Sequence, residues 1–403
     1  MINELFVIGL IIVVAFILGE FCKLIKVPRV VGHILAGLIF GLNFIKDRLF
    51  DQNSLNTVNS LAEIGVIFLF FFVGLNINLR EFKFNLKESF LVSLFNFLLP
   101  LTAGFLISKF VLQFETLTSV IIGITLSATS QIIAVDLLQE LKILKKRVGN
   151  IIVTSGATND VFELVLVSVI LTLINSSTTA FRGLYTPIAN ISIFLVILFL
   201  LRFLIFPYIL KFFERSKSNT SLFSGAIIIA LITAALSDLF GLGILIGALF
   251  SGIMIRQILL TGKHPKPWEE HYIAKSIHLV SYGFLVPIFF VTAGLKTDLL
   301  SLSGNLNLVL IFLAIALLGT LGGSILGVIL SKGGFKEGVI VGFGMSSRGD
   351  IEIVIATLAL QAGLFTSVMF SSIVIMAIIT TLISPIMFRY LSRKYRYYLN
   401  VKH

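Results

Sequence analysis

Two charged residues, Arg348 and Asp160, lie near the middle of long apolar segments and far from any predicted loop. Arg348 lies in VIVGFGMSSRGDIEIVIATLAL, and Asp160 lies in IIVTSGATNDVFELVLVSVI. A charged side chain at the centre of a bilayer costs at least a few kcal/mol, so such a charge normally marks a path for an ion or a proton. The two residues therefore predict ion chemistry at mid-membrane depth.

Polar and glycine residues gather in the middle of two apolar segments, 117–138 and 336–361. The clusters consist of Ser127, Thr129, Ser130 and Gln131 in the first segment, and Gly342, Gly344, Ser346, Ser347, Arg348 and Gly349 in the second. Uncovered backbone groups at this depth are tolerated only where they line a cavity, so the clusters predict two helices that break inside the membrane. The alternative interpretation is that the hydroxyls bond back to their own helices.

Two breaks that face each other would bring helix ends of opposite partial charge together. Helix N-termini carry a partial positive charge, and helix C-termini carry a partial negative charge. Arg348 would offset the negative ends, and a carboxylate or a hydroxyl would offset the positive ends.

The composition identifies the class of protein in which this chemistry lies. Of the 403 residues, 57% are hydrophobic and 13% are charged, against about 25% charged in a soluble domain. Apolar runs of about 18 residues or more recur from end to end, so we expect an all-α polytopic membrane protein with about thirteen transmembrane helices. The expected spans are 3–22, 29–45, 57–76, 89–112, 117–138, 148–174, 187–210, 220–239, 242–262, 277–295, 306–330, 336–361 and 366–388.

The net charge of +11 indicates membrane topology rather than nucleic-acid binding. Most of the 31 Lys and Arg residues fall on one side of the membrane if the N-terminus is outside. Because basic residues accumulate on the cytoplasmic side, we expect an outside N-terminus, a cytoplasmic C-terminus and no nucleic-acid partner. The single cysteine, Cys22, excludes internal disulfides and a cysteine metal site. The sequence contains no nucleophile triad and no phosphate-binding loop, so we expect neither a cofactor nor an enzyme.

Three pairs of similar segments predict an internal repeat. FLFFFVGLNINL resembles PIFFVTAGLKTDL, HILAGLIFG resembles ILIGALFSG, and SATSQIIAV resembles GMSSRGDIEIVIA. The first six expected spans therefore match the last six, with 187–210 as the connector, and the odd offset gives the two halves opposite orientations. Inverted repeats of this kind place a transport site near the bilayer midplane and build it from discontinuous helices.

Five longer motifs make the chain resemble the monovalent cation:proton antiporter-2 family, the Kef/NapA-type exchangers. The motifs are VPRVVGHILAGLIFGLN, LAEIGVIFLFFFVGLNINL, SATSQIIAVDLLQELKILKKRVGNIIVTSGATNDVFEL, LVPIFFVTAGLKTDL and GFGMSSRGDIEI. The resemblance implies a NhaA/NapA-like fold with two discontinuous crossing helices. It also implies secondary active exchange of a monovalent cation for a proton, by alternating access.

The resemblance further implies a division of one transmembrane domain, 1–403, into a dimerisation panel and a mobile core. The panel would comprise 1–88 and 220–300, the core 89–180 and 304–390, and a linker helix 187–213. We expect a homodimer in the plasma membrane, with no soluble regulatory domain. The transported Na+ or K+ and H+ would be its ligands, and membrane lipid its surroundings.

The resemblance assigns roles to individual positions. The family's ion-binding aspartate falls on Asp160, and the position before it falls on Asn159. Its crossover threonine falls on Thr129, beside Ser130, and its core arginine falls on Arg348. Oxygen atoms of Asp160, Thr129 and Asn159 would replace the hydration shell of a monovalent cation.

The chain departs from the family pattern at three positions. Asn159 stands where many members have a second acid, and the helix before Arg348 has no lysine, with Thr320 near the expected place. These two departures agree with each other, because a neutral Asn159 needs no cationic partner. In the family the single-acid pattern goes with electroneutral exchange, so the resemblance implies one proton per cation. Gln131 replaces a proline common after the Thr-Ser pair, which alters the expected shape of that break.

Further polar residues are candidates for accessory roles. Glu163 lies one turn beyond the aspartate and could be a second proton site or an entrance residue. Glu352 lies four residues after Arg348 and could pair with it along the helix, whereas we expect Asp350 to point elsewhere. Asp136 could gather cations at the mouth of the site. The accessory candidates are Glu163, Gln131, Asp136, Ser346, Ser347 and Glu352.

Three classes of function remain open. Exchange of Na+ for H+ is favoured, and K+ in place of Na+ is the nearest alternative. A channel-like K+ efflux module is another alternative. Such modules usually carry a soluble nucleotide-binding domain, and we expect no such domain here. A sodium-coupled organic-anion symporter of the same fold is less favoured, because an Asp and an Arg with few other polar residues suit no large organic substrate.

Overall fold

The computed structural model describes residues 3–77, 86–144, 146–175, 185–214, 218–260 and 272–395, and these ranges are helical apart from their connections. The helices are α1 (Glu4–Leu24), α2 (Arg29–Phe40), α3 (Asn43–Leu49), α4 (Gln52–Asn76), α5 (Leu86–Leu106), α6 (Thr116–Ser127), α7 (Gln131–Glu140), α8 (Arg147–Asn175), α9 (Tyr185–Leu204), α10 (Phe206–Glu214), α11 (Asn219–Leu239), α12 (Ile244–Leu260), α13 (Tyr272–Val280), α14 (Val286–Leu295), α15 (Leu299–Ser303), α16 (Leu306–Leu330), α17 (Phe335–Met345), α18 (Ile351–Gln361) and α19 (Ser367–Lys394). A wider π-helical turn, Ile107–Val111, continues α5, and another, Ser281–Leu285, joins α13 to α14.

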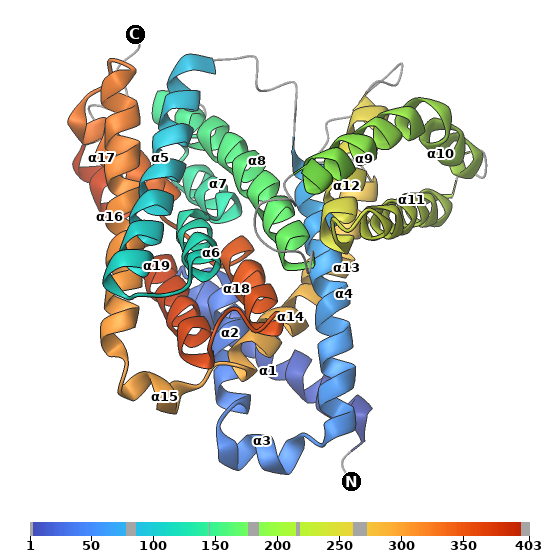
Figure 1. Cartoon of the computed structure of the whole chain (residues 1–403), viewed down its shortest axis with the longest axis horizontal. Coiled ribbons are helices and arrows are strands. Elements are labelled where there is room, and N and C mark those ends of the chain that lie inside the picture. The colour runs from blue at the N-terminus through green and yellow to red at the C-terminus, as the bar shows by residue number, and fades with distance from the viewer. Residues whose placement is uncertain are drawn as a thin grey trace. The chain divides into compact units, whose positions relative to one another are not determined.

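The chain divides into two compact units, whose helices are labelled in Figure 1. The first unit contains 1–12, 50–78 and 167–290, and the second contains 13–49, 79–166 and 291–403. All of the candidate site residues lie in the second unit. The division into a panel and a mobile core stays a prediction.

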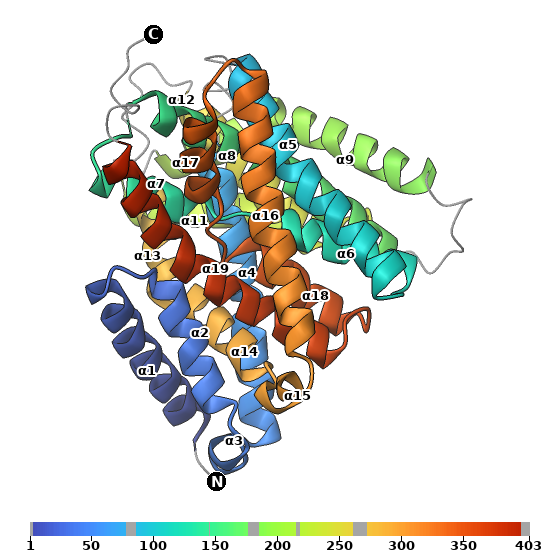
Figure 2. The same cartoon turned by 90° about the vertical axis from the view of Figure 1, so that its left-hand side faces the viewer.

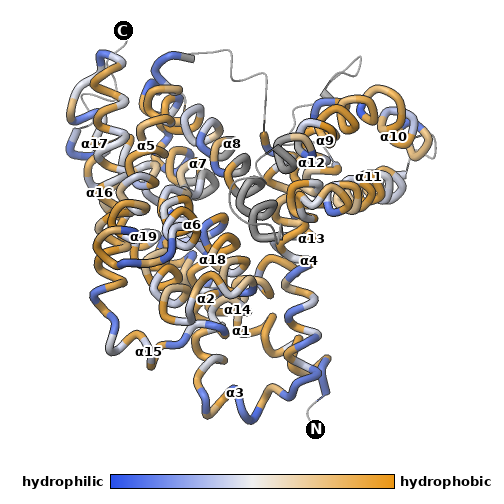
Figure 3. Tube along the Cα trace, viewed as in Figure 1, coloured by the Kyte–Doolittle hydropathy of each residue, from blue (hydrophilic) through white to orange (hydrophobic). Residues whose placement is uncertain are grey.

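Long apolar helices dominate the part of the chain that the structure describes (Figure 3). Seven of the described helices have the length and hydropathy of a membrane span, or nine if each of two bent pairs counts as one span. The bent pairs are α2 with α3, at 81°, and the later part of α9 with α10, at 40°. Each expected span falls on one helix or on a broken run of helices. Because breaks divide several of them, the number of thirteen crossings stays a prediction.

Small residues allow close helix packing in both units. In the first unit, Gly74 of α4 lies against Gly252 of α12, where an added Cβ would overlap the facing backbone. In the second unit, Gly294 of α14 lies against Gly37 of α2 in the same way. Close backbone contact through glycine is a common means of helix association in membranes, where lipid is as apolar as the helix surfaces.

Helices α5 and α16 run side by side in the second unit (Figure 2). Gly323 and Gly327 of α16 lie directly against the backbone of α5. The Asn96 side chain of α5 donates from Nδ2 to Ser324 Oγ at 2.7 Å and to the Thr320 carbonyl oxygen at 3.2 Å. These contacts orient the face of α16 that carries Thr320.

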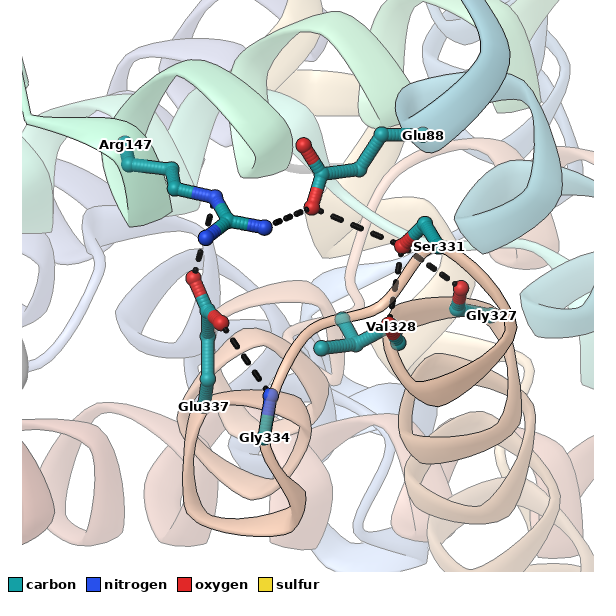
Figure 4. Close-up of polar contacts among 7 residues, drawn as sticks. All are labelled: Glu88, Arg147, Gly327, Val328, Ser331, Gly334 and Glu337. Atoms are coloured by element: carbon teal, nitrogen blue, oxygen red, sulfur yellow. Dashed lines mark hydrogen bonds and ion pairs between the residues drawn. The ribbon is translucent and has the colours of Figure 1, made fainter. Parts of the chain in front are cut away.

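An ion-pair cluster joins four helix ends of the second unit (Figure 4). Arg147, at the start of α8, lies between two carboxylates, with Nη2 2.6 Å from Glu88 Oε1 and Nε 3.5 Å from Glu337 Oε1. The Ser331 hydroxyl, at the end of α16, donates to Glu88 Oε1 at 3.4 Å. Glu88 and Glu337 lie in the first turns of α5 and α17, where a negative charge complements the helix dipole.

Candidate functional site

Two helix breaks meet in the second unit, at the polar clusters that the sequence analysis identified. Helix α6 ends at Ser127 and α7 begins at Gln131, whereas α17 ends at Met345 and α18 begins at Ile351. The backbone N–H of Ser130 donates to the carbonyl oxygen of Ser347 at 2.7 Å. The breaks leave the Ser130 N–H and the Ser347 carbonyl oxygen without helical partners, and the two groups satisfy each other.

The Arg348 guanidinium is fully buried, with 0% of the residue exposed. Its Nη1 donates to the carbonyl oxygen of Ala128, at the C-terminal end of α6. Its Nη2 donates to Thr320 Oγ1 at 3.0 Å and to the Ala316 carbonyl oxygen at 3.3 Å, both on α16. A cation at this place offsets the partial negative charge of the α6 terminus and ties α6 to α16.

Thr381 of α19 holds the backbone of the same arginine. Its hydroxyl accepts from the Arg348 N–H at 3.3 Å and donates to the Arg348 carbonyl oxygen. One hydroxyl can do both, because it carries one donor hydrogen and two lone pairs. No signal in the sequence marks this contact, because Thr381 lies in an apolar helix without a neighbouring charge or glycine break.

A second polar network surrounds Thr129, beside the start of α7. Glu163 Oε1 accepts from the Thr129 backbone N–H at 3.0 Å and from Asn159 Nδ2 at 2.7 Å. Asn159 Nδ2 also donates to Thr129 Oγ1 at 3.0 Å. Asn159 and Glu163 are both 0% exposed. The carboxylate of Glu163 therefore lies beside the positive end of α7, in direct contact with the break rather than at an entrance.

One acceptor of Asn159 has no hydrogen-bond donor among the described residues. Its Oδ1 atom is buried and accepts no hydrogen bond from the described residues. A buried amide oxygen without a donor is costly, so it favours a ligand that needs an oxygen.

The expectation that Asp350 points away from the break is wrong. Its Oδ2 accepts from the Ser130 hydroxyl at 3.1 Å, across the two breaks. The reason is backbone geometry: Gly349 has φ of +145°, a conformation that few residues with a side chain adopt, and it redirects the chain immediately after Arg348.

The expected ion pair between Glu352 and Arg348 is absent from the described contacts. Glu352 is 0% exposed, and neither of its carboxyl oxygens accepts a hydrogen bond from the described residues. Both Nη atoms of Arg348 instead donate to acceptors on α6 and α16, so the tip of the guanidinium is directed to those helices.

The remaining candidates divide into two groups. Ser346 bonds back to its own helix, donating to the Gly342 carbonyl oxygen at 2.5 Å, whereas Ser347 contributes its carbonyl to the contact between the breaks. The side chains of three candidates, Asp160 on α8 and Gln131 and Asp136 on α7, lie outside the part of the chain whose side chains the structure describes. Only the helical backbone at these positions is therefore part of the site as observed.

Comparison with known proteins shows the family. The family model described as "Sodium/hydrogen exchanger, transmembrane" matches residues 10–394. The chain belongs to the sodium/hydrogen exchanger family. Membership makes it a transmembrane transporter rather than an enzyme. Because the match is to this general family, the narrower assignment to the monovalent cation:proton antiporter-2 branch, the Kef/NapA type, is not supported.

Two bacterial relatives resemble this exchanger along nearly their whole length. The Na(+)/H(+) antiporter of Enterococcus hirae is 28% identical over 96% of this chain and 98% of its own. The Na(+)/H(+)-K(+) antiporter GerN of Bacillus cereus is 28% identical over 96% of this chain and 95% of its own. The solved structure of the sodium proton antiporter MjNhaP1 from Methanocaldococcus jannaschii matches with a TM-score of 0.70 and 20% identity, covering 98% of each chain. That likeness shows a shared polytopic helical fold.

Proposed function

We propose that this protein exchanges a monovalent cation for a proton across the membrane, and that it does so at the two contacting helix breaks. The buried network of Thr129, Asn159 and Glu163 beside the break carries the proposal. Family membership supports antiport, and the printed functions of the relatives support Na+ as the cation, with K+ as the second candidate.

The cation site consists of Asp160, Asn159 and Thr129, with Ser130 beside them. The Oδ1 of Asn159, which accepts no hydrogen bond from the described side chains or backbone, supports this assignment, because a cation that loses its hydration shell needs oxygen ligands in its place. A carboxylate at this depth holds either a proton or a cation, since a bare buried charge is expensive. Competition for one aspartate is therefore sufficient to couple the two fluxes.

We propose that exchange is electroneutral, with one proton per cation. Asn159 is neutral, and the position expected for a partner lysine holds Thr320, whose hydroxyl accepts from Arg348. No second charge of the aspartate site then has to cross the membrane with the cation. Arg348 keeps its position within the core, because it is bonded to α6, α16 and α19.

We propose the following architecture around the site. About thirteen spans form an inverted repeat, in which α2 is equivalent to α12 and α4 is equivalent to α14. The glycine contact of α4 with α12 is then the repeat counterpart of the contact of α2 with α14, which supports the repeat. The panel forms a homodimer in the plasma membrane, with the N-terminus outside, the C-terminus in the cytoplasm and the core moving between the two sides.

The experiment that tests this function is Asp160→Asn in proteoliposomes with a pH dye inside. The amide keeps the shape but holds neither a proton nor a charge, so cation-dependent proton movement should fall to background with Na+, K+ and Li+. Asp51→Asn, at the N-cap of α4 in the first unit, is the matched control and should exchange normally, because asparagine caps a helix as well as aspartate does. Near-normal exchange by Asp160→Asn would place the site elsewhere.

The same assay separates the alternative functions. If the protein were a channel, its ion fluxes would not saturate with ion concentration and would depend on voltage. An organic-anion symporter would move protons or Na+ only when an organic acid is added. Scanning the cations one at a time decides between Na+ and K+.

A further inference from the structure

The exposed face of α19 changes from apolar to basic toward its C-terminal end. Ile383, Ile386 and Tyr390 are all exposed, and their spacing of three and four residues places them on one face of the helix. Arg393 and Lys394 follow on the same face and are also exposed. An apolar strip on this helix therefore leads directly into a basic end.

A groove of about 530 Å³ lies at this basic end. Its volume is within the range of small-molecule sites, about 300–1,000 Å³. The groove is lined by Ile386, Arg389, Tyr390, Arg393 and Lys394. The lining contains three cationic side chains and no carboxylate, so its charge is complementary to an anion.

Two of these cations keep their charge available for a ligand. The ion pairs among the described residues include neither Arg393 nor Lys394. The Lys394 ammonium lies over two aromatic rings, 5.6 Å from the ring centre of Tyr390 and 5.7 Å from that of Tyr395. An aromatic ring orients an ammonium group without neutralising its charge.

The third cation, Arg389, fixes the groove to its surroundings. Its Nε and Nη2 donate to Glu140 Oε2 of α7 at 3.2 Å and 2.9 Å, and Nη2 also donates to the Lys26 carbonyl oxygen at 3.2 Å. The end of α19 lies beside α7 in Figure 2. The groove is therefore preformed, which lowers the cost of ordering its side chains around a ligand.

The length of α19 places the groove at the level of the lipid headgroups. The helix has 28 residues, or about 42 Å at about 1.5 Å per residue, whereas the hydrocarbon layer of a bilayer is about 30 Å thick. One end must extend beyond that layer, and charged side chains avoid hydrocarbon, so it is the basic end. Tyr390 then lies at the interface, where tyrosine is common, and Ile383 lies at the depth of the acyl chains.

We propose that this groove binds an anionic phospholipid from the leaflet on the side of the C-terminus. The lipid phosphate lies between Arg393 and Lys394, and an acyl chain runs along Ile386 and Ile383. A free phosphate would use the basic end alone and leave the apolar strip uncovered. The proposal needs only a chain that spans the membrane, and it does not depend on the cation site at Asp160.

The test uses a single tryptophan in the groove. The chain has one tryptophan, so Trp268→Phe combined with Tyr390→Trp leaves fluorescence from the groove alone. The double variant is placed in bilayers that contain lipid with brominated acyl chains, which quench tryptophan on contact. Brominated phosphatidylglycerol should quench at about one fifth of the mole fraction that phosphatidylcholine with the same chains needs, because basic residues beside a membrane attract anionic lipid. Equal quenching by the two lipids overturns the proposal.

Two charge variants in the same background assign the preference to the groove. Arg393→Gln with Lys394→Gln should make the two lipids quench equally. Lys146→Gln with Lys332→Gln is the matched control, since it removes the same charge from exposed residues that do not line the groove. The control should keep the preference for phosphatidylglycerol. Retention of the preference in the groove variant, or an equal loss in the control, overturns the proposal.

The same experiment detects other occupants of the groove. If a second copy of the chain covers this face, neither brominated lipid quenches the groove tryptophan. If the groove takes free phosphate, inorganic phosphate changes the emission while the two lipids quench equally. Either result overturns the proposal.

A second measurement needs no tryptophan variant. The melting temperature of the wild-type protein in detergent should rise more with added phosphatidylglycerol than with phosphatidylcholine, and Arg393→Gln with Lys394→Gln should remove the difference. Equal melting temperatures of the wild type in the two lipids count against the groove. Asp160→Asn should keep the lipid preference, so failure of the proposed exchange site and failure of the lipid site are distinguishable.

Discussion

The backbone N–H of Ser130 donates to the carbonyl oxygen of Ser347 at 2.7 Å, and the Ser130 hydroxyl donates to Asp350 at 3.1 Å. Through these bonds one residue connects the break between α6 and α7 to the break between α17 and α18. The backbone bond needs only an amide hydrogen, whereas the second bond needs the side chain. The two contributions can therefore be separated by substitution.

Ser130→Ala and Ser130→Pro should differ in stability. The alanine variant keeps the backbone bond and loses one hydroxyl bond, a cost of about 0.5–1.5 kcal/mol. The proline variant also lacks the amide hydrogen and leaves the Ser347 carbonyl without its donor, which adds about 1–3 kcal/mol. Thermal unfolding in detergent should rank wild type above Ser130→Ala and Ser130→Pro last. Equal melting temperatures for the two variants would contradict the contact between the breaks.

Removal of the Arg348 side chain should lower both stability and transport. Hydrogen bonds to charged groups contribute about 1.5–3 kcal/mol each, and Arg348→Ala loses those to Ala128, Ala316 and Thr320 together. Arg348→Lys should recover only part of the loss, because an ammonium cannot reach all three acceptors from one position. The measurements are the melting temperature in detergent and exchange in proteoliposomes.

Thr320→Val is the control for the arginine variants. Valine has a volume similar to that of threonine but removes one acceptor of Arg348. It should lower the melting temperature less than Arg348→Ala does. Full activity and full stability of Arg348→Ala would show that the guanidinium does not hold the core together.

Glu163 should act as a positioning residue for the break. In Glu163→Gln, the amide oxygen can still accept from the Thr129 N–H and from Asn159, so the fold and the Na+ affinity should stay near wild type. Glu163→Ala leaves the Thr129 N–H without an acceptor and should cost about 1–3 kcal/mol of stability. A collapse of Na+ binding in a stable Glu163→Gln variant would instead make Glu163 a proton or cation ligand.

An ion cluster outside the expected spans should make stability depend on pH. Glu140, the last residue of α7, is 3.1 Å from Lys26 Nζ and 2.9 Å from Arg389 Nη2. Burial alone would raise the pKa of Glu140, but hydrogen bonds and charges from Arg389 and Lys26 outweigh it, so its pKa lies below the ordinary value. A lowered pKa in the folded state stabilises the protein above the pKa of the unfolded chain, and this contribution disappears as the pH falls through the folded value.

The melting temperature of Glu140→Gln should therefore be below that of wild type at pH 7, and the gap should close in acid. Glutamine cannot pair with either cation, so the variant lacks the pH-dependent part of the stabilisation. The gap should be small, because partly exposed ion pairs contribute little. A gap that stays constant down to pH 3 would mean that the cluster makes no ionic contribution.

The sequence alone determined the membrane class, the helical segments and the positions of both breaks. These features depend on short stretches of chain: apolar runs mark helices, and the polar and glycine residues around Thr129 and Arg348 interrupt them. Local composition carries this information because helix formation and helix breaking are themselves local.

Only the tertiary structure decided which groups meet at the breaks. Arg348 donates to Ala128 and Thr320 instead of pairing with Glu352, although Glu352 is closer in sequence. Asp350 faces Ser130 because Gly349 redirects the backbone, and Thr381 arrives from a helix without any sequence signal. Such partners depend on how distant helices pack, and a buried polar group bonds to whichever acceptor the packing brings within about 3 Å.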